Sequence, residues 1–463
     1  MPGAKASGRP QARLPNYPFI ISNEATNTDP ETRKGIRRHV MLGKNRGKYR
    51  RSGHGTLVTP EDVAISDDGY TPVEEPHVAV PRTIGTYLAF TPLPEMVERH
   101  AAVEAIHTVT SALKARFVLG TCLVFDAPDS TLLERHSHDA TFFQSVIWMT
   151  QAFRESAQGN GSGYPDRRPL LKTLRLLREK LSLMDERTQV PDETLFVVTN
   201  LAAHARVAGE DQSAMHHMEG IRKIVGLRGG ISEITHPKLM VELLRCDLGM
   251  ALHTGAKSFF CYEVPYFDYF LQYPDEVGFQ RETDRSFDGL DHNIITAWQF
   301  MKRFCSVINA AAEAEGRVPW KVFLDSMKSV MYRLLNMRFD AGSINETIRL
   351  GLLSFSSSVF LQWKLVRLPF TYLTDSYRDS LNILESSDFL SPELYSWLLM
   401  VYFVSAFKQP DDDPWLCTRL RASMESCGVN SWNEMQTVLE TLMWIRLLPE
   451  DARKDVFDSV FRT

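Results

Sequence analysis

Two consecutive helical patterns over residues 207–260, each ended by glycine, constrain the fold most strongly. The first has its apolar residues on one face: Met215, Met218, Ile221, Ile224 and Val225. Gly229 and Gly230 supply the left-handed conformation that ends many helices, and Pro237 suits the first turn of the next. The second also has an apolar stripe: Leu239, Leu243, Leu244, Leu248 and Ala251. The pattern predicts a buried helical hairpin.

The same helical spacing continues on both sides of this hairpin. Upstream, apolar residues recur at helical intervals after Asp139, which is placed to cap a helix, and again over 192–209. Downstream, the spacing predicts helices at 292–314, 319–338, 343–367, 371–386, 392–408, 413–427 and 431–446. No alternation long enough to compete as β-sheet is present. We therefore expect an all-α fold, a large array of antiparallel helices over residues 81–463.

The sequence before this array divides into a basic segment and an acidic one. Residues 33–51 contain nine Lys or Arg and no carboxylate. The rest of the chain is therefore more acidic than the net charge of −5 for the whole chain indicates. We expect 1–51 to be a largely disordered basic arm, and 52–80, rich in Gly, Pro and acid, to be a flexible linker. The candidate contact residues of the arm are Arg37, Arg38, Lys44, Arg46, Lys48, Arg50 and Arg51.

Three interpretations of the arm compete. It is a signal for a nuclear import receptor, a segment that neutralises DNA phosphates, or a solvated segment with no dedicated partner. A basic arm in front of an acidic body favours a partner that meets the arm and not the body.

The hairpin also carries a family resemblance. The run MHHMEGIRKIVGLRGG, followed by LLRCDLGMALHTGAKSFF, resembles the central signature of the fungal-specific transcription factor domain, second type, which often follows a Zn2Cys6 DNA-binding cluster. Segments 391–407 and 430–445 resemble the family in the expected order. The signature positions are His216 or His217, Gly220, Arg228-Gly229-Gly230, Asp247, Gly255 and Phe259-Phe260.

The resemblance implies a nuclear transcriptional regulator whose helical domain modulates activity or binds partners. The chain departs from the family's best-known form because the C-x2-C-x6-C half-motif of the zinc cluster is absent. The scattered cysteines form no C-x2-C pair: Cys122, Cys246, Cys261, Cys305, Cys417 and Cys427. We therefore expect no zinc and no sequence-specific DNA binding through such a cluster.

The search for catalytic motifs predicts no enzyme. The chain has no H-E-x-x-H, P-loop, G-x-S-x-G or kinase signature. The best metal candidate is the run with Glu134, His136, His138 and Asp139, but we favour the alternative of a polar loop leading into an Asp139 cap. His217 is expected to be a hydrogen-bonded packing residue and His216 to be exposed.

Asp247 lies on a mostly apolar helix, so we expect it to be buried and paired with an arginine such as Arg222 or Arg228, in a structural role. We expect no cofactor, no metal and no membrane span. The expected partners are DNA or an import receptor at the arm, other transcription regulators, and a second copy in a homodimer. Alternatives are a helical co-regulator with no DNA binding of its own, an effector-sensing domain, and an enzyme without a recognisable motif.

Overall fold

The computed structural model describes residue 100 and residues 118–124, 139–158, 167–183, 190–261, 289–363, 366–384, 390–406, 412–448 and 450–462. By internal contacts the chain divides at Val80, and every described element belongs to the second unit, Pro81–Thr463. The predicted arm and linker lie outside the described residues.

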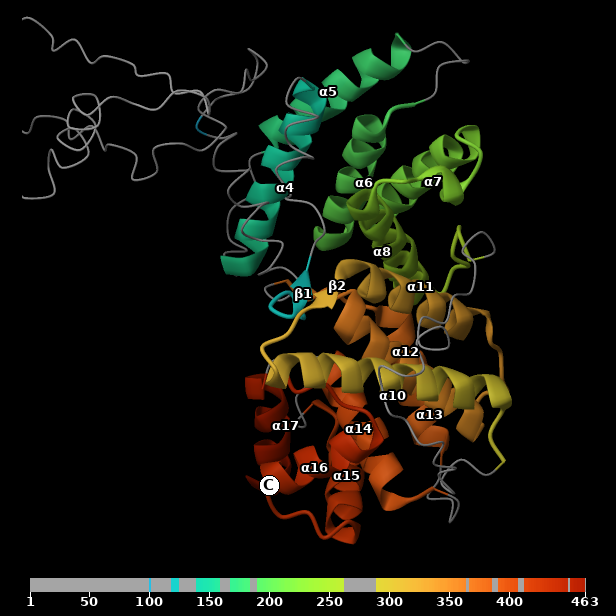
Figure 1. The fold of residues 1–463 in the computed structure, drawn as a ribbon, viewed down its shortest axis with the longest axis vertical. Coiled ribbons are helices and arrows are strands. Elements are labelled where there is room, and N and C mark those ends of the chain that lie inside the picture. Colours follow the sequence, from blue (N-terminus) through green and yellow to red (C-terminus); the bar gives the residue numbers. More distant parts are fainter. Residues whose placement is uncertain are drawn as a thin grey trace, which may run out of the picture. The chain divides into compact units, whose positions relative to one another are not determined.

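The described part of the chain is all-α, as predicted (Figure 1). Its helices are α4 (Ala140–Gln158), α5 (Arg168–Ser182), α6 (Asp192–Val207), α7 (Asp211–Leu227), η2 (Ile231–Glu233), α8 (Pro237–Thr254), α10 (His292–Glu313), α11 (Trp320–Asn336), α12 (Ile344–Phe360), α13 (Thr371–Ile383), α14 (Pro392–Ala406), α15 (Pro414–Ser426), α16 (Trp432–Leu442) and α17 (Glu450–Arg462). The only sheet among the described residues is a two-residue parallel pairing of β1 (Leu123–Val124) with β2 (Val318–Pro319).

The predicted hairpin consists of α7, η2 and α8. At the end of α7 the amide of Gly229 donates to the Gly226 carbonyl at 3.1 Å, and the amide of Gly230 donates to the Val225 carbonyl at 3.0 Å. With φ values of +100° and +114° at the two glycines, this is a Schellman motif. Helix α8 begins at Pro237, as expected.

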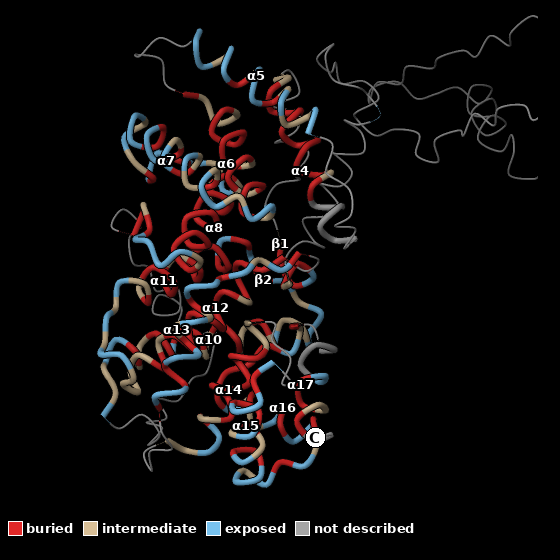
Figure 2. The backbone as a smooth tube through the Cα atoms, turned by 180° about the vertical axis from the view of Figure 1, so that it is seen from behind, coloured by how far each residue is buried: buried red, intermediate tan, exposed pale blue. Residues whose placement is uncertain are grey.

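Helix α8 is buried far beyond the predicted stripe. Every residue from Val241 to Leu252 is buried, polar residues included (Figure 2). The reason is that α8 contacts α6, α7, α11 and α13, so neighbours cover it on several sides. Helix α8 is therefore central because of the helices that surround it, and its own sequence does not specify which helices these are.

The helices from α10 onward pack around α12 and α14. Helix α12 contacts α10, α11, α13 and α14, and α14 also contacts α15, α16 and α17. Within this group the Trp298 and Trp397 rings pack edge to face with centroids 4.7 Å apart. A single cluster of buried apolar residues extends from Leu119 to Val460. This core therefore includes residues of the helices from α4 to α17.

One predicted boundary was wrong, and one helix was not predicted. Helix α12 ends at Phe360 and does not extend to 367, because the Arg245 side chain binds the carbonyl oxygens of Phe360 and Leu361. Helix α17 was not predicted, although its Val456, Phe457 and Val460 are buried.

No helix in the described ranges has both the length and the hydropathy needed to cross a bilayer.

Candidate functional site

Most of the sequence-predicted site residues lie outside the described part of the chain. This holds for the seven basic residues Arg37, Arg38, Lys44, Arg46, Lys48, Arg50 and Arg51, and for Glu134, His136 and His138 of the metal candidate. The structure therefore describes one member of that candidate, Asp139.

Asp139 is the predicted helix cap. Its Oδ1 accepts hydrogen bonds from the amides of Thr141 at 2.9 Å and Phe142 at 3.0 Å, at the start of α4. Its Oδ2 pairs with the Lys180 ammonium of α5. These donors hold the pKa of Asp139 below its ordinary value, against burial, which raises it. The carboxylate thus joins α4 to α5.

The paired histidines of α7 show no ligand geometry. His216 is exposed, as predicted, and His217 is half-buried. Burial lowers the pKa of His217, and the neighbouring His216 lowers it further. Across the described residues, no group of three or more His, Cys, Asp or Glu side chains could hold a metal ion.

Asp247 is buried, as predicted, but the partners named for it were wrong. Its carboxylate accepts from the amides of Phe259 at 2.7 Å and Phe260 at 3.2 Å. The Tyr332 hydroxyl of α11 donates to it at 2.9 Å. The Asp247 carboxylate is therefore satisfied by backbone amides beyond the end of α8 and by a hydroxyl, and not by an arginine. These hydrogen bonds fix the segment after α8 and attach it to α11.

The two arginines named as partners bind elsewhere. Arg228 pairs with Asp192 at 2.6 Å, joining the end of α7 to the start of α6. Arg222 lies over the Phe259 ring with its guanidinium carbon 6.0 Å from the centroid. Neither arginine pairs with Asp247, because each is held at another contact.

Charged side chains that the sequence analysis did not select line a small cavity between α6, α8 and the segment after α12. Its volume is about 30 Å³, room for a water molecule or a ligand of a few atoms. The lining is mostly apolar but includes two arginines, a glutamate and a thiol: Ala203, Arg206, Glu242, Arg245, Cys246, Gly249, Leu361, Trp363, Leu368 and Phe370. An apolar lining with a few polar groups is typical of small-molecule sites.

Arg245 is the most constrained of these groups. Its Nη1 donates to the Phe360 carbonyl at 2.5 Å and its Nη2 to the Leu361 carbonyl at 2.6 Å. Its Nε lies 3.9 Å from the Glu242 carboxylate, one helical turn away. The guanidinium caps α12 and offsets the Glu242 charge, so a buried cation and a buried anion are compensated together.

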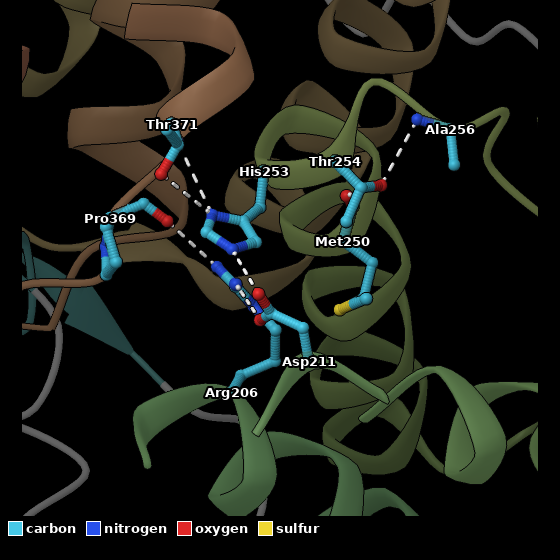
Figure 3. A network of polar contacts seen from close by, with 8 residues as sticks. All are labelled: Arg206, Asp211, Met250, His253, Thr254, Ala256, Pro369 and Thr371. Atoms are coloured by element: carbon cyan, nitrogen blue, oxygen red, sulfur yellow. Dashed lines mark hydrogen bonds and ion pairs between the residues drawn. The ribbon is translucent and has the colours of Figure 1, made fainter. Parts of the chain in front are cut away.

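Arg206 belongs to a second network at the edge of the cavity (Figure 3). Its Nη2 donates to the Pro369 carbonyl at 3.0 Å, and its Nη1 lies 3.5 Å from Asp211. Asp211 also contacts His253 of α8 at 3.0 Å, and the Thr371 amide donates to the other ring nitrogen of His253 at 3.4 Å. This network joins α6, α7, α8 and the start of α13.

The cavity lining includes one thiol, that of Cys246. Burial, with the nearby Glu242 charge, raises the pKa of Cys246 to about 12, so the thiol is protonated at neutral pH. Burial also lowers the pKa of His204 to about 4, and its neutral ring packs on Trp148 with centroids 4.4 Å apart. Cys246 therefore lines the cavity as a thiol and not as a thiolate, whereas His204 lies outside the lining.

The sequence did carry one signal for this site. Arg206, Glu242 and Arg245 each interrupt a mostly apolar helical segment, as Asp247 does, and a charge in such a segment needs a partner when buried. The carbonyl groups that Arg206 and Arg245 bind come from Phe360, Leu361 and Pro369, more than a hundred positions further on, so this part of the site could not be assembled from local spacing. Comparisons of the chain with protein-family models, curated protein sequences and solved structures gave no match.

Proposed function

We propose that this protein is a nuclear transcriptional regulator of the fungal type, in which a helical regulatory body follows a basic arm. The observation that carries the proposal is the charge asymmetry: a carboxylate-free basic segment at 33–51 precedes an acidic chain. The ordered likeness of the hairpin and of the C-terminal segments to the fungal transcription factor domain supports the same conclusion.

The arm makes the contacts that require positive charge. Arg and Lys side chains neutralise phosphates without reading bases, so binding through the arm alone is steeply salt-dependent and weakly selective. These 463 residues contain no C-x2-C pair of the kind that builds the zinc cluster, and we expect selectivity to come from a partner. The same basic residues serve import into the nucleus. We expect no catalytic activity and no cofactor.

The direct test is a titration of a mixed-sequence DNA duplex with the full-length protein at two salt concentrations. The comparison variant replaces Arg37, Arg38, Lys44, Arg46, Lys48, Arg50 and Arg51 with glutamine. We expect the wild-type protein to bind, with affinity falling steeply as salt rises, and the variant to lose at least tenfold at low salt. A control that replaces seven basic residues of the helical body should bind as the wild type does.

Nuclear accumulation in cells separates the two roles of the arm. The seven-residue variant should remain outside the nucleus if the arm is an import signal. The proposal fails if the variant matches the wild type both in DNA affinity and in nuclear accumulation.

The cavity favours a second candidate function, the sensing of a small effector. The lining carries two arginines against one glutamate, so it is net positive among apolar walls, and a ligand of a few atoms with a carboxylate is the class to test first. The test is a thermal-shift titration with acetate and propionate, against chloride at equal ionic strength. Gly249→Ala serves as the variant, because a methyl group there enters the cavity lining and meets only Phe370 Cε1, at 3.7 Å. A shift in the wild type that Gly249→Ala abolishes supports sensing, and equal shifts in carboxylate and chloride contradict it.

A further inference from the structure

Helix α5 presents leucines to solvent. Leu171 is 63% exposed and Leu181 is 42% exposed, and Leu183, just after the helix, is 86% exposed. Four of the eight exposed large apolar residues in the described part of the chain belong to this helix and its end. Isolated exposed leucines are ordinary, but a group on one element indicates an interaction surface.

The exposed residues form a ridge with a defined spacing. Leu171, Leu174, Arg178 and Leu181 follow one another at intervals of three, four and three residues, which is the spacing of the a and d positions of a heptad. The adjacent side of α5, about 100° around the helix, carries the buried Thr173 and Leu177, and α5 packs on α4. One side of the helix is therefore used by the fold, and a second apolar ridge is left over.

The charges around this ridge are almost all positive. Helix α5 contains five basic residues and one acidic residue: Arg168, Lys172, Arg175, Arg178, Lys180 and Glu179. Lys180 is paired with Asp139 of α4, and Arg175 with Glu179 at 2.9 Å. Arg178 lies within the ridge itself, so a helix packed along it places a residue beside a guanidinium.

We propose that the α5 ridge, formed by Leu171, Leu174, Arg178 and Leu181, is a docking site for an acidic amphipathic helix of a partner protein. Leucines of the partner pack against the three leucines of the ridge, and its carboxylates face Arg178 and the flanking basic residues. The inference goes beyond the proposed function, since it does not depend on what the arm binds.

The charge on α5 selects this occupant over a second copy of the chain. A dimer through two α5 ridges would bring two predominantly basic helices together, and like charges across an interface are unfavourable. An acidic helix has the complementary charge and the matching spacing.

The experiment measures binding of a fluorescent peptide to the full-length protein by anisotropy. The probe is a three-heptad peptide with leucine at a and d and glutamate at the flanking positions, and its lysine counterpart is the control. We expect the acidic peptide to bind with affinity that falls as salt rises, and the lysine peptide to bind at least tenfold more weakly.

Three variants locate the site. Leu171→Gln, Leu174→Gln and Leu181→Gln combined should weaken binding at least tenfold, with the melting temperature measured to confirm that the fold is intact. Leu227→Gln, at a leucine of α7 that is 75% exposed, should change nothing. Arg178→Glu should weaken the acidic peptide and improve the lysine peptide, a reversal that a purely structural role would not produce.

Each remaining outcome overturns the proposal. Equal binding of the acidic peptide by the wild type and the triple variant places the site elsewhere. No binding of the acidic peptide, together with binding to anionic phospholipid vesicles that the triple variant loses, assigns the ridge to a membrane surface. Self-association that the triple variant loses, measured by sedimentation, assigns it to a second copy.

Discussion

Helices α8 and α5 use charged and apolar residues in opposite ways. Helix α8 buries Arg245 and Asp247, whereas α5 exposes Leu171 and Leu181. On α8, Arg245 and Asp247 bind backbone groups outside the helix, and so fix where α12 ends and where the segment after α8 turns. On α5 the exposed leucines are not covered by any other element in the described part of the chain. Buried charge here serves the fold, and exposed apolar surface points to binding.

The largest effect should follow from removing the charge at the centre of this contrast. Asp247→Ala leaves the Phe259 and Phe260 amides and the Tyr332 hydroxyl without their acceptor, and should lower the free energy of unfolding by roughly 3–5 kcal/mol. Urea denaturation followed by circular dichroism measures the loss. Asp247→Asn retains one acceptor oxygen and should lose less. If the alanine variant were as stable as the wild type, α8 would not anchor the segment after it.

The pH dependence of stability tests whether the buried imidazole of His204, on α6, is neutral in the folded chain. The pKa of His204 is lowered by burial to about 4, below the ordinary 6.5, so the unfolded chain binds a proton that the folded chain does not between these values. Stability from this group is complete above pH 6.5 and is lost as pH falls through 4, by about 3 kcal/mol in all.

The matched variant for this titration is His204→Phe, which retains a ring against Trp148 and removes the proton. Its free energy of unfolding should fall less than that of the wild type between pH 6.5 and 4. Parallel curves for the two proteins would mean that His204 titrates normally in the folded chain.

Two helical glycines sharpen the comparison at the level of packing. A Cβ added at Gly351 of α12 would lie 2.8 Å from Leu398 and from the Tyr377 hydroxyl, whereas one added at Gly249 of α8 would lie 3.7 Å from Phe370. Gly351→Ala should cost about 1–3 kcal/mol by overpacking, and Gly249→Ala should gain about 0.5–1 kcal/mol from helix propensity. Thermal unfolding of the pair measures both, and a gain at position 351 would contradict this packing.

The smallest effect is expected on α5. Leu171→Gln should change the free energy of unfolding by no more than about 0.5 kcal/mol, because the side chain is already in water. The matched core substitution, Leu248→Ala on α8, should cost about 2–5 kcal/mol. Urea denaturation of both variants provides the comparison. A large loss for Leu171→Gln would mean that the ridge packs within the molecule and is not a binding surface.

Much of this contrast could be read from the sequence, but not the part that defines the sites. The glycine pair, Pro237 and the Asp139 cap act locally, so the hairpin and the start of α4 followed from spacing alone. The burial of α8 on all sides depends on which helices surround it, and the end of α12 depends on Arg245, which lies more than a hundred residues earlier. The α5 leucines follow helical periodicity wherever they point, so their exposure required the packing of α4 and α5.

The most direct test of this account is hydrogen exchange, measured by mass spectrometry on the full-length protein with and without the acidic peptide. We predict that the amides of α8 exchange slowest in both conditions, because the helix is central. The amides of α5 should exchange faster and slow when the peptide is added, with no change in α8. Fast exchange in α8, or protection by the peptide that spares α5, would contradict the assignment of one helix to the core and the other to binding.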